Sequence, residues 1–403
     1  MNKVYIVQAK RTAIGSFLGT LADVNPSELG SALIKDILDN VKVDVTDIDE
    51  VVVGNILPAG LGQGMGRQVA IKAGLPKEVI GYSVNMVCGS GMKAIMNGYA
   101  NIALGLHNLV FAGGVENMST APFLTPKTAR TGHKLGDMVL KDHMVFDALT
   151  DAYEGYHMGV TAENIQEKHN ITREEQDAFA YNSQQKAISA IDNGRFKDEI
   201  VPFEIKKRKE TIIFDTDEYP NRRSTLEKLG TLRTVFKKGG TVTAGNASGI
   251  NDGASMVLLA NQKMIDKYNL QPLAEIVAIG QGGVDPSVMG LGPVPAIKNV
   301  LETANMKLND IELLELNEAF AVQSLGVVKE LSEQHNVSED WILNRTNVNG
   351  GAIALGHPVG VSGNRIIVTL IHEMIKRNNT YGLASLCIGG GMGTAVIIKN
   401  LRK

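Results

Sequence analysis

Two thiols stand in glycine-rich settings that suit covalent chemistry. Cys88 lies in Cys-Gly-Ser-Gly, where a predicted strand runs into a predicted helix. Backbone N–H groups and the helix dipole favour a thiolate at such a position, and the glycines let a substrate approach the backbone closely. A small buried side chain at a strand end is the alternative interpretation. Cys387 opens Cys-Ile-Gly-Gly-Gly-Met-Gly after another predicted strand, so the second thiol is equally open to a substrate.

One histidine is embedded in a third glycine-rich segment. His357 stands within residues 349–363, which read Asn-Gly-Gly-Ala-Ile-Ala-Leu-Gly-His-Pro-Val-Gly-Val-Ser-Gly. So many glycines argue against a plain packing role, and histidine is the most common partner that activates a cysteine. A lone histidine is otherwise as often a core residue as a catalytic one. A cysteine–histidine pair is therefore the leading hypothesis.

Two polar segments complete the candidate site. Residues 317–321, Asn-Glu-Ala-Phe-Ala, open a predicted helix directly after the apolar run 313–316. Residues 243–254, Thr-Ala-Gly-Asn-Ala-Ser-Gly-Ile-Asn-Asp-Gly-Ala, form a loop of the kind that contacts a cofactor through backbone and hydroxyl groups. Dinucleotide, P-loop, zinc-metalloprotease and nucleophile-elbow motifs are excluded, because none of their residue spacings occurs.

The elements that must position these side chains alternate between strands and helices. Residues 119–247 are less regular and look like an insertion, while the alternation returns from residue 274. Such alternation is typical of a mainly parallel sheet covered by helices. A helical stripe is expected through Met92, Ile95, Met96, Tyr99 and Ala103. The other expected elements are Val4–Ala9, Pro26–Leu38, Val51–Ile56, Tyr82–Val87, Leu109–Ala112 and Ala384–Ile388.

Length and composition limit the classes of function. A chain of 403 residues is long enough for two or three packed units. Its net charge of −3 offers no overall basic field for nucleic acid or anionic lipid, and the basic run 206–210 is expected to be a solvated face. No run reaches the roughly 18 apolar residues of a membrane span, and residues 1–8 read as a strand rather than a signal segment, so we expect a cytoplasmic protein. Two distant cysteines exclude a disulfide framework and a cysteine zinc site.

Taken together and in this order, the motifs resemble those of the thiolase family over the whole chain. Each motif alone is only suggestive, but the full series is very specific. Among thiolases the resemblance is closest to the acetyl-CoA acetyltransferases. The matching segments are Lys10–Gly15, Val87–Gly91, Gly113–Ser119, Tyr156–Glu163, Gly245–Gly253, Asn317–Phe320, Gly356–Pro358 and Cys387–Gly393.

The resemblance implies an α/β fold of two similar βαβαβαββ halves, stacked as five αβαβα layers with an inserted loop domain. We expect the N-terminal half to comprise residues 1–118 and 248–271, and the C-terminal half residues 272–403. Residues 119–247 would form the loop domain, with coenzyme A binding and oligomer contacts. The resemblance also implies a homotetramer (a dimer of dimers) and no metal.

The resemblance also assigns roles to residues. It implies Cys88 as the nucleophile, His357 as its activating base and Cys387 as the acid/base. Asn317 would hold a water that forms one oxyanion hole with His357, and the N–H groups of Gly389 and Cys88 would form the second. The expected coenzyme A contacts are Ser248, Ala244, His157, Met158, Leu149, Met289, Ala319 and Phe320. Asn221 replaces an arginine expected near the nucleotide, which makes Arg222 and Arg223 the candidates for that contact.

The activity that the resemblance implies is the condensation of two acetyl-CoA to acetoacetyl-CoA and its thiolytic reversal, through an acylated cysteine. Coenzyme A thioesters would be the substrates, with no prosthetic group and no nucleic-acid or membrane partner, in lipid metabolism such as the mevalonate pathway. A degradative 3-ketoacyl-CoA thiolase of broader chain length is the alternative. A β-ketoacyl carrier-protein synthase usually has a second histidine where Cys387 stands, and an inactive acyl-CoA binder would be expected to lose Cys88 or His357.

Overall fold

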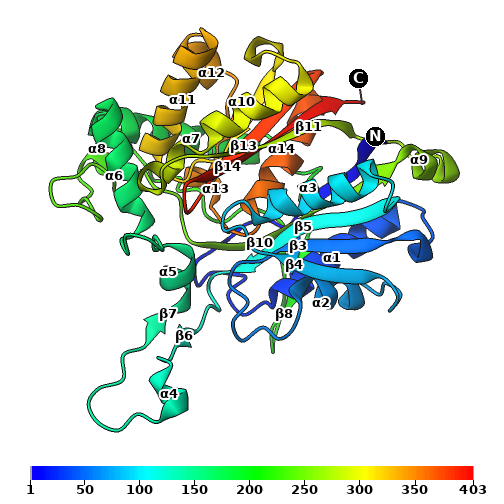
Figure 1. Cartoon of the computed structure of the whole chain (residues 1–403), viewed down its shortest axis with the longest axis horizontal. Coiled ribbons are helices and arrows are strands. Elements are labelled where there is room, and N and C mark those ends of the chain that lie inside the picture. The colour runs from blue at the N-terminus through cyan, green and yellow to red at the C-terminus, as the bar shows by residue number, and fades with distance from the viewer. Residues whose placement is uncertain (1, 403) are drawn as a thin grey trace.

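A computed structural model describes residues 2–402 of the chain (Figure 1). Within these residues ten strands form one continuous sheet, in the order β12-β13-β14-β11-β1-β10-β5-β3-β4, with β2 paired to β10. The strands are β1 Val4–Arg11, β2 Gly15–Ser16, β3 Glu50–Gly54, β4 Ile80–Val84, β5 Leu109–Asn117, β10 Asn251–Asn261, β11 Ala274–Gly283, β12 Leu313–Leu316, β13 Tyr381–Ile388 and β14 Met392–Asn400.

The sheet consists of two halves with the same strand order. Across the N-terminal half of the sheet the neighbouring strands are β4, β3, β5, β10 and β1. Numbered by their order along the chain, these are the third, second, fourth, fifth and first strands of that half. The C-terminal half repeats this order with β12, β13, β14 and β11 as its second, fourth, fifth and first strands. Its third strand is reduced to Thr346, which forms a single bridge with Leu314 of β12. The halves meet where Tyr5 and Ile6 of β1 pair antiparallel with Glu275 and Ala274 of β11.

The expectation of a mainly parallel sheet is wrong at the level of strand pairs. β3 pairs in parallel with β4 and β5, and β12 with β13, whereas the remaining pairs of the main sheet are antiparallel. The cause is the last strand of each half: β10 inserts between β1 and β5, and β14 between β11 and β13, each against the direction of its neighbours. Both strands follow the βαβ part of their half in the chain, so the alternation of strands and helices does not predict their antiparallel direction.

Helices cover and separate the two halves in five αβαβα layers (Figure 1). Helices α3 and α14 pack against each other between the two half-sheets, while α1 and α2 cover the outer face of one half and α10 and α11 that of the other. The bounds are α1 Pro26–Asn40, α2 Met65–Lys72, α3 Ser90–Ala103, α10 Pro293–Ala304, α11 Ala321–His335 and α14 Ser362–Arg377.

Strand alternation explains this layering. On β5, Leu109 and Phe111 point into the core under α1 and α2, whereas Val110 and Ala112 point into the core around α3 and α14. Successive side chains of a strand face opposite sides, so a strand that is apolar at every position requires cover on both faces. Fully burying one such large side chain contributes roughly 1.5–3 kcal/mol. Apolar runs of this kind, such as residues 109–112 of β5, therefore need the middle layer of helices as cover.

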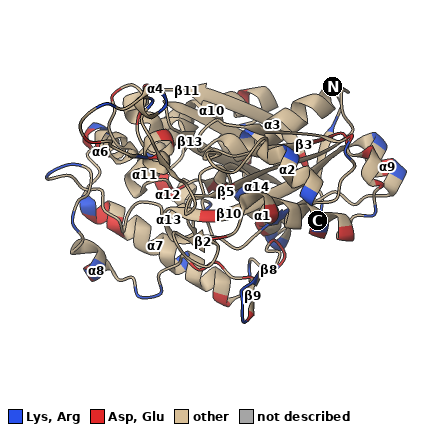
Figure 2. Cartoon of the chain, turned by 90° about the horizontal axis from the view of Figure 1, so that it is seen from below, with Lys and Arg blue, Asp and Glu red and all other residues tan. Residues whose placement is uncertain are grey.

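Residues between β5 and β10 form smaller elements outside these layers. The segment with β6, α4 and β7 projects away from the body (Figure 1), and the basic run 206–210 is exposed at the tip of the β8–β9 hairpin (Figure 2). These elements are β6 Phe123–Leu124, α4 Thr128–Thr131, β7 Lys141–Asp142, α5 His143–Ala148, α6 Met158–His169, α7 Arg173–Asp192, β8 Phe203–Lys206, β9 Thr211–Phe214 and α8 Leu226–Gly230. The remaining helices are α9 Gln262–Tyr268, α12 Glu339–Leu343 and α13 Ala352–Leu355.

A buried ion cluster ties this insertion to the first strand. Arg11 is fully buried and lies 2.6 Å from Glu199 and 2.7 Å from Asp217, both of which belong to the inserted segment. Removing one partner of such a cluster typically costs about 3–5 kcal/mol, because the charge that remains is buried without compensation. The insertion is thus held firmly on the sheet region. No helix within residues 2–402 is both long and apolar enough to cross a membrane.

Candidate active site

Cys88 lies in a tight turn between β4 and α3. The strand ends at Val84, three residues earlier than predicted, and Val87 adopts a left-handed backbone with φ of 45°. The hydroxyl of Ser90 accepts from the Met86 N–H at 2.8 Å and donates to the Val87 carbonyl at 2.6 Å, which holds the turn closed. A strained non-glycine backbone of this kind is typical of functional sites.

The surroundings of the Cys88 thiol disfavour its ionisation. Burial raises its pKa to about 11, although the N–H groups of Gly389 and of Cys88 itself, directed at the sulfur, oppose that rise. Burial thus opposes the thiolate that the helix start is expected to favour. The loss of hydration outweighs the two N–H groups, so a base is needed to take the proton during reaction.

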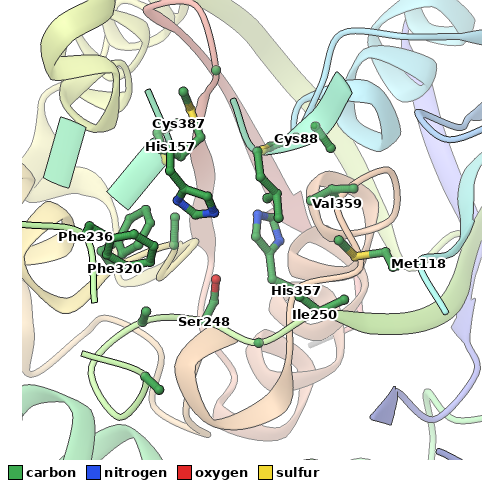
Figure 3. A pocket seen from close by; sticks show the side chains of 18 of the residues that line it. Cys88, Met118, His157, Phe236, Ser248, Ile250, Phe320, His357, Val359 and Cys387 are labelled. Carbon is green, nitrogen blue, oxygen red and sulfur yellow. The ribbon is translucent and has the colours of Figure 1, made fainter. Parts of the chain in front are cut away.

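His357 lies directly below Cys88, with its imidazole ring directed toward the thiol (Figure 3). Its backbone N–H donates to Asn251 at 2.9 Å, and its Nδ1 lies 2.5 Å from the Ser362 hydroxyl. That hydroxyl donates to the Pro358 carbonyl at 3.1 Å. It therefore accepts from Nδ1–H and leaves Nε2 as the unprotonated nitrogen. Burial and the nearby Arg365 guanidinium lower the pKa of His357 to about 4, so the ring is a neutral base.

Cys387 lies at the end of β13, on the other side of the same opening (Figure 3). It is 1% exposed, and burial followed by the proximity of Cys88 raises the pKa of its thiol strongly. Gly389 follows in the turn toward β14. A side chain there would lie 3.5 Å from Val87 and 3.6 Å from Met158, in ordinary contact. Both thiols and the imidazole thus share one space.

Asn317 follows β12 and is buried, with 1% of its surface exposed. Its backbone N–H donates to the Ser385 carbonyl at 3.0 Å. Neither its side-chain oxygen nor its side-chain nitrogen has a hydrogen-bond partner within residues 2–402. A buried amide with free donor and acceptor groups suits the binding of a water molecule, as the sequence motif implies.

A cavity of about 390 Å³ brings Cys88, His357 and Cys387 together and is lined by residues of the insertion and of both halves (Figure 3). Among the predicted residues it is lined by Cys88, His357, Cys387, Gly389, Ser248, Ala244, His157, Met158, Leu149, Met289, Ala319 and Phe320. The lining that the sequence analysis missed comprises Phe17, Met118, Ala148, Tyr219, Val235, Phe236, Ala247, Gly249, Ile250 and Val359. Asn317, Arg222 and Arg223 are not part of this lining.

Phe236 is the most informative of the missed residues. Its ring stacks on that of His157, whose Nδ1 accepts from the Gly159 N–H at 3.0 Å at the start of α6. Burial lowers the pKa of His157, so this ring too is neutral. Phe236 stands beside Val235 in a segment without a motif, and only an aromatic residue within a polar stretch could have drawn attention to it.

The two candidate arginines for the nucleotide contact differ. Arg222 pairs with Asp192 at 2.5 Å on the surface, with both side chains more than half exposed. Arg223 lines an outer hollow beside Lys228, and this hollow shares Tyr219 and Ala244 with the main cavity. The structure thus separates two adjacent residues that the sequence could not distinguish.

The comparisons with known proteins agree with this geometry. The model of the thiolase N-terminal domain matches residues 4–263, and that of the thiolase C-terminal domain matches residues 270–400. An acetyl-CoA acetyltransferase from Pseudomonas aeruginosa is 51% identical over 399 residues, which cover 99% of both chains.

Two solved structures are similar over nearly their whole length. The acetyl-CoA acetyltransferase from Syntrophomonas wolfei superposes with a TM-score of 0.96 at 42% identity, covering 99% of this chain and 100% of the other. Human mitochondrial 3-ketoacyl-CoA thiolase superposes with a TM-score of 0.93 at 43% identity, covering 99% of each chain. With its five-layered fold and both domain models matched in order, the chain belongs to the thiolase family.

Proposed function

We propose that the protein is an acetyl-CoA C-acetyltransferase, which condenses two acetyl-CoA to acetoacetyl-CoA and coenzyme A and catalyses the reverse thiolysis. The observation that carries the proposal is a single cavity lined by two thiols and a neutral imidazole, Cys88, Cys387 and His357. Carbon–carbon bond formation between thioesters needs a nucleophile that is also a good leaving group and a separate base for a carbon acid. Two thiols with one imidazole meet both needs.

In the first half-reaction Cys88 gives its proton to Nε2 of His357 and attacks the thioester carbonyl. The N–H groups of Gly389 and Cys88 that now face the sulfur support stabilisation of the tetrahedral oxyanion. One such donor is typically worth about 100- to 1000-fold in rate. The carbon–sulfur bond to coenzyme A breaks, and the leaving sulfur takes the proton of Cys387, which becomes a thiolate.

In the second half-reaction the Cys387 thiolate removes a proton from the acetyl carbon of the second acetyl-CoA. The imidazolium of His357 and the water held by Asn317 stabilise the enolate oxygen. The carbanion attacks the acetyl carbonyl on Cys88, the carbon–sulfur bond to Cys88 breaks, and Cys88 regains its proton from His357. All three side chains return to their starting protonation states, and the same steps in reverse cleave acetoacetyl-CoA.

The cavity lining supports a short acyl chain. Met158, Met289 and the stacked rings of His157 and Phe236 surround the space next to the thiols. Each added methylene must displace packed atoms, and overpacking typically costs about 1–3 kcal/mol. The broader degradative 3-ketoacyl-CoA thiolase remains the second candidate, because the human thiolase of that name has the same fold at 43% identity.

Thiolysis and condensation assays across acyl chain lengths test the proposal. We expect acetoacetyl-CoA to be cleaved much faster than 3-ketohexanoyl-CoA, and acetyl-CoA alone to yield acetoacetyl-CoA. Equal efficiency on 3-ketooctanoyl-CoA would replace this assignment with the degradative one. Absence of both reactions, together with no acetylated Cys88 in peptide maps, would contradict acyl transfer altogether.

The proposal extends to the assembly and setting of the protein. We propose a homotetramer of cytoplasmic location that serves lipid biosynthesis such as the mevalonate pathway, with residues 119–247 as the loop domain that makes oligomer contacts. Large apolar side chains exposed along the projecting segment support the tetramer, namely Phe123, Leu135, Val139 and Leu140. Exposed apolar groups concentrated on one segment are typical of an interaction surface. Light scattering and sedimentation measure the mass.

A further inference from the structure

One fully buried carboxylate near the cavity has no part in the proposed reaction. Glu116, at the end of β5, accepts four hydrogen bonds. Its Oε1 accepts from the Asn55 side-chain amide at 2.9 Å and the Leu57 N–H at 3.1 Å. Its Oε2 accepts from the Ile56 and Gly360 N–H groups, both at 3.0 Å. Every one of these neighbours is a donor, so a proton on this carboxyl would displace a hydrogen bond.

The four donors come from both halves of the molecule. Asn55, Ile56 and Leu57 follow β3 in the N-terminal half. Gly360 lies three residues after His357, in the segment that leads into α14 of the C-terminal half. One carboxylate therefore joins the segment that carries the base to the half that carries the nucleophile.

Close backbone packing surrounds the same point. A Cβ atom on Gly54 or Gly91 would lie 2.9 Å from the Gly360 carbonyl oxygen, and one on Gly114 only 2.2 Å. Gly91 belongs to the first turn of α3, three residues after Cys88. The segment of His357 thus crosses the start of the Cys88 helix with no side chain between the two backbones. A shift at this crossing would therefore change the position of His357 relative to Cys88.

Two of the anchored residues, Ile56 and Leu57, pack next to the cavity, against its lining residue Val359. Ile56, Leu57 and Val359 belong to one apolar cluster, against which the Cys88 side chain packs. Burial raises the pKa of Glu116 to about 7, its three N–H donors lower it, and Asp252 is a nearby acid that raises it further. The negative charge of Glu116 also lies near enough to Cys88 to oppose ionisation of the thiol.

We propose that Glu116 is a positioning residue, which acts through the Gly360 amide to hold His357 in register with Cys88 across the two halves. It touches neither substrate nor the reacting atoms. This inference rests on the proposed acyl transfer to Cys88. Misplacement of a reacting group by about 1 Å can cost roughly 100-fold in rate, which sets the scale of the expected effect.

Two substitutions of Glu116 separate the effect of its hydrogen-bonding position from the effect of its charge. Glu116→Asp keeps the charge but shortens the reach, so it cannot span from residues 55–57 to Gly360. Glu116→Gln keeps the length, removes the charge and turns an NH₂ group toward N–H donors. Glu50→Gln is the matched control: Glu50 is also buried and accepts from Asn101 at 3.1 Å, at the opposite end of β3.

The two readouts are single-turnover acetylation of Cys88 by acetyl-CoA and its alkylation by iodoacetamide at a fixed pH of 8. We expect acetylation to fall roughly 100-fold in both Glu116 variants. Alkylation should stay within about twofold of wild type in Glu116→Asp and rise several-fold in Glu116→Gln, because removal of a nearby negative charge favours the thiolate. Glu50→Gln should match the wild type in both.

Acetylation at the wild-type rate in Glu116→Asp overturns the inference. Parallel loss of acetylation and alkylation, with a matching fall in thermal stability, also overturns it, since that is the result of a merely structural role. If Glu116→Gln does not fold, the Glu116→Asp result decides alone. Failure of the wild type itself to acetylate Cys88 is a different result, which refutes the proposed function rather than the role of Glu116.

Discussion

The imidazole of His157 lies stacked on the ring of Phe236, with centroids 4.5 Å apart and planes inclined by 17°. A perpendicular contact of Phe236 with Phe320, at 6.2 Å, extends the pair along the cavity. Aromatic pairs of this kind are worth about 0.5–1.5 kcal/mol beyond the area that they bury. This side of the cavity is therefore stiff, and we expect the flexible side chain of Met158 to limit the length of the acyl chain.

Shortening Met158 should relax the chain-length limit. We expect Met158→Ala to raise the activity on 3-ketohexanoyl-CoA relative to acetoacetyl-CoA by about tenfold, because relief of about 1.4 kcal/mol of overpacking corresponds to that factor. Thiolysis rates on the two substrates measure it. Met306→Ala, outside the cavity, serves as the control and should leave the ratio unchanged; an unchanged ratio in Met158→Ala would show that another residue sets the limit.

Removing the second thiol should separate the two half-reactions. In Cys387→Ala we expect acetylation of Cys88 to persist at a reduced rate, because His357 still takes the proton of Cys88 while the leaving sulfur loses its proton donor. Hydrogen exchange at the acetyl carbon should fall at least about 100-fold with loss of the base. Mass spectrometry of the acyl-enzyme and deuterium exchange into acetyl-CoA measure the two steps. Equal loss of both would indicate that Cys387 supports the site as a whole.

The pH dependence of Cys88 alkylation should reflect the raised pKa of its thiol. With a pKa of about 11 the thiolate fraction rises about tenfold for each pH unit between 7 and 10. His357, with a pKa of about 4, stays neutral over that range and adds no further step to the pH dependence of alkylation. We expect iodoacetamide inactivation to follow this slope, to modify Cys88 before the more strongly shifted Cys387, and to be slowed by acetyl-CoA. A plateau already at pH 7–8 would reveal a thiolate–imidazolium pair instead.

Substitution of Arg222 and substitution of Arg223 should change the KM for acetyl-CoA to different extents. Arg223→Gln should raise the KM for acetyl-CoA by up to about fivefold, the effect of losing an exposed ion pair worth about 1 kcal/mol. The loss should shrink at high salt. Arg222→Gln is the control, since Arg222 pairs with Asp192 and does not line the hollow. Steady-state kinetics at two salt concentrations decide; equal effects of both substitutions would contradict the assignment.

Ser362 should matter through the tautomer of His357. In Ser362→Ala the Nδ1–H loses its acceptor, and we expect acetylation of Cys88 to slow by about 10- to 100-fold, part of the roughly 100- to 10,000-fold that a positioned base contributes. Nitrogen NMR of labelled histidine should show a mixture of tautomers. Ser31→Ala removes a buried hydroxyl of α1 bonded to Glu28 at 3.0 Å and should alter neither measurement. A single tautomer in Ser362→Ala would refute this role.

Local sequence determined much of this protein. The stripe of Met92, Ile95 and Met96 does form the buried face of α3, and Pro26 does open α1 behind the Asn25 cap. Glycine-rich segments around Cys88, Cys387 and His357 marked all three, because close approach of backbone and ligand requires glycine within a few residues. Such features depend on neighbours in the chain, so they can be read without a structure.

Tertiary structure alone decided the rest. The antiparallel insertion of β10 depends on which strands it meets after more than a hundred residues of other elements. Burial, which raises the pKa of the Cys88 thiol against the effect of the helix start, is a property of the assembled site. Phe236 lines the cavity because residues from distant segments surround it there. Arg222 differs from Arg223 because Arg222 pairs with Asp192, thirty residues earlier in the chain. Desolvation and long-range packing act between residues far apart in sequence, and no local pattern encodes them.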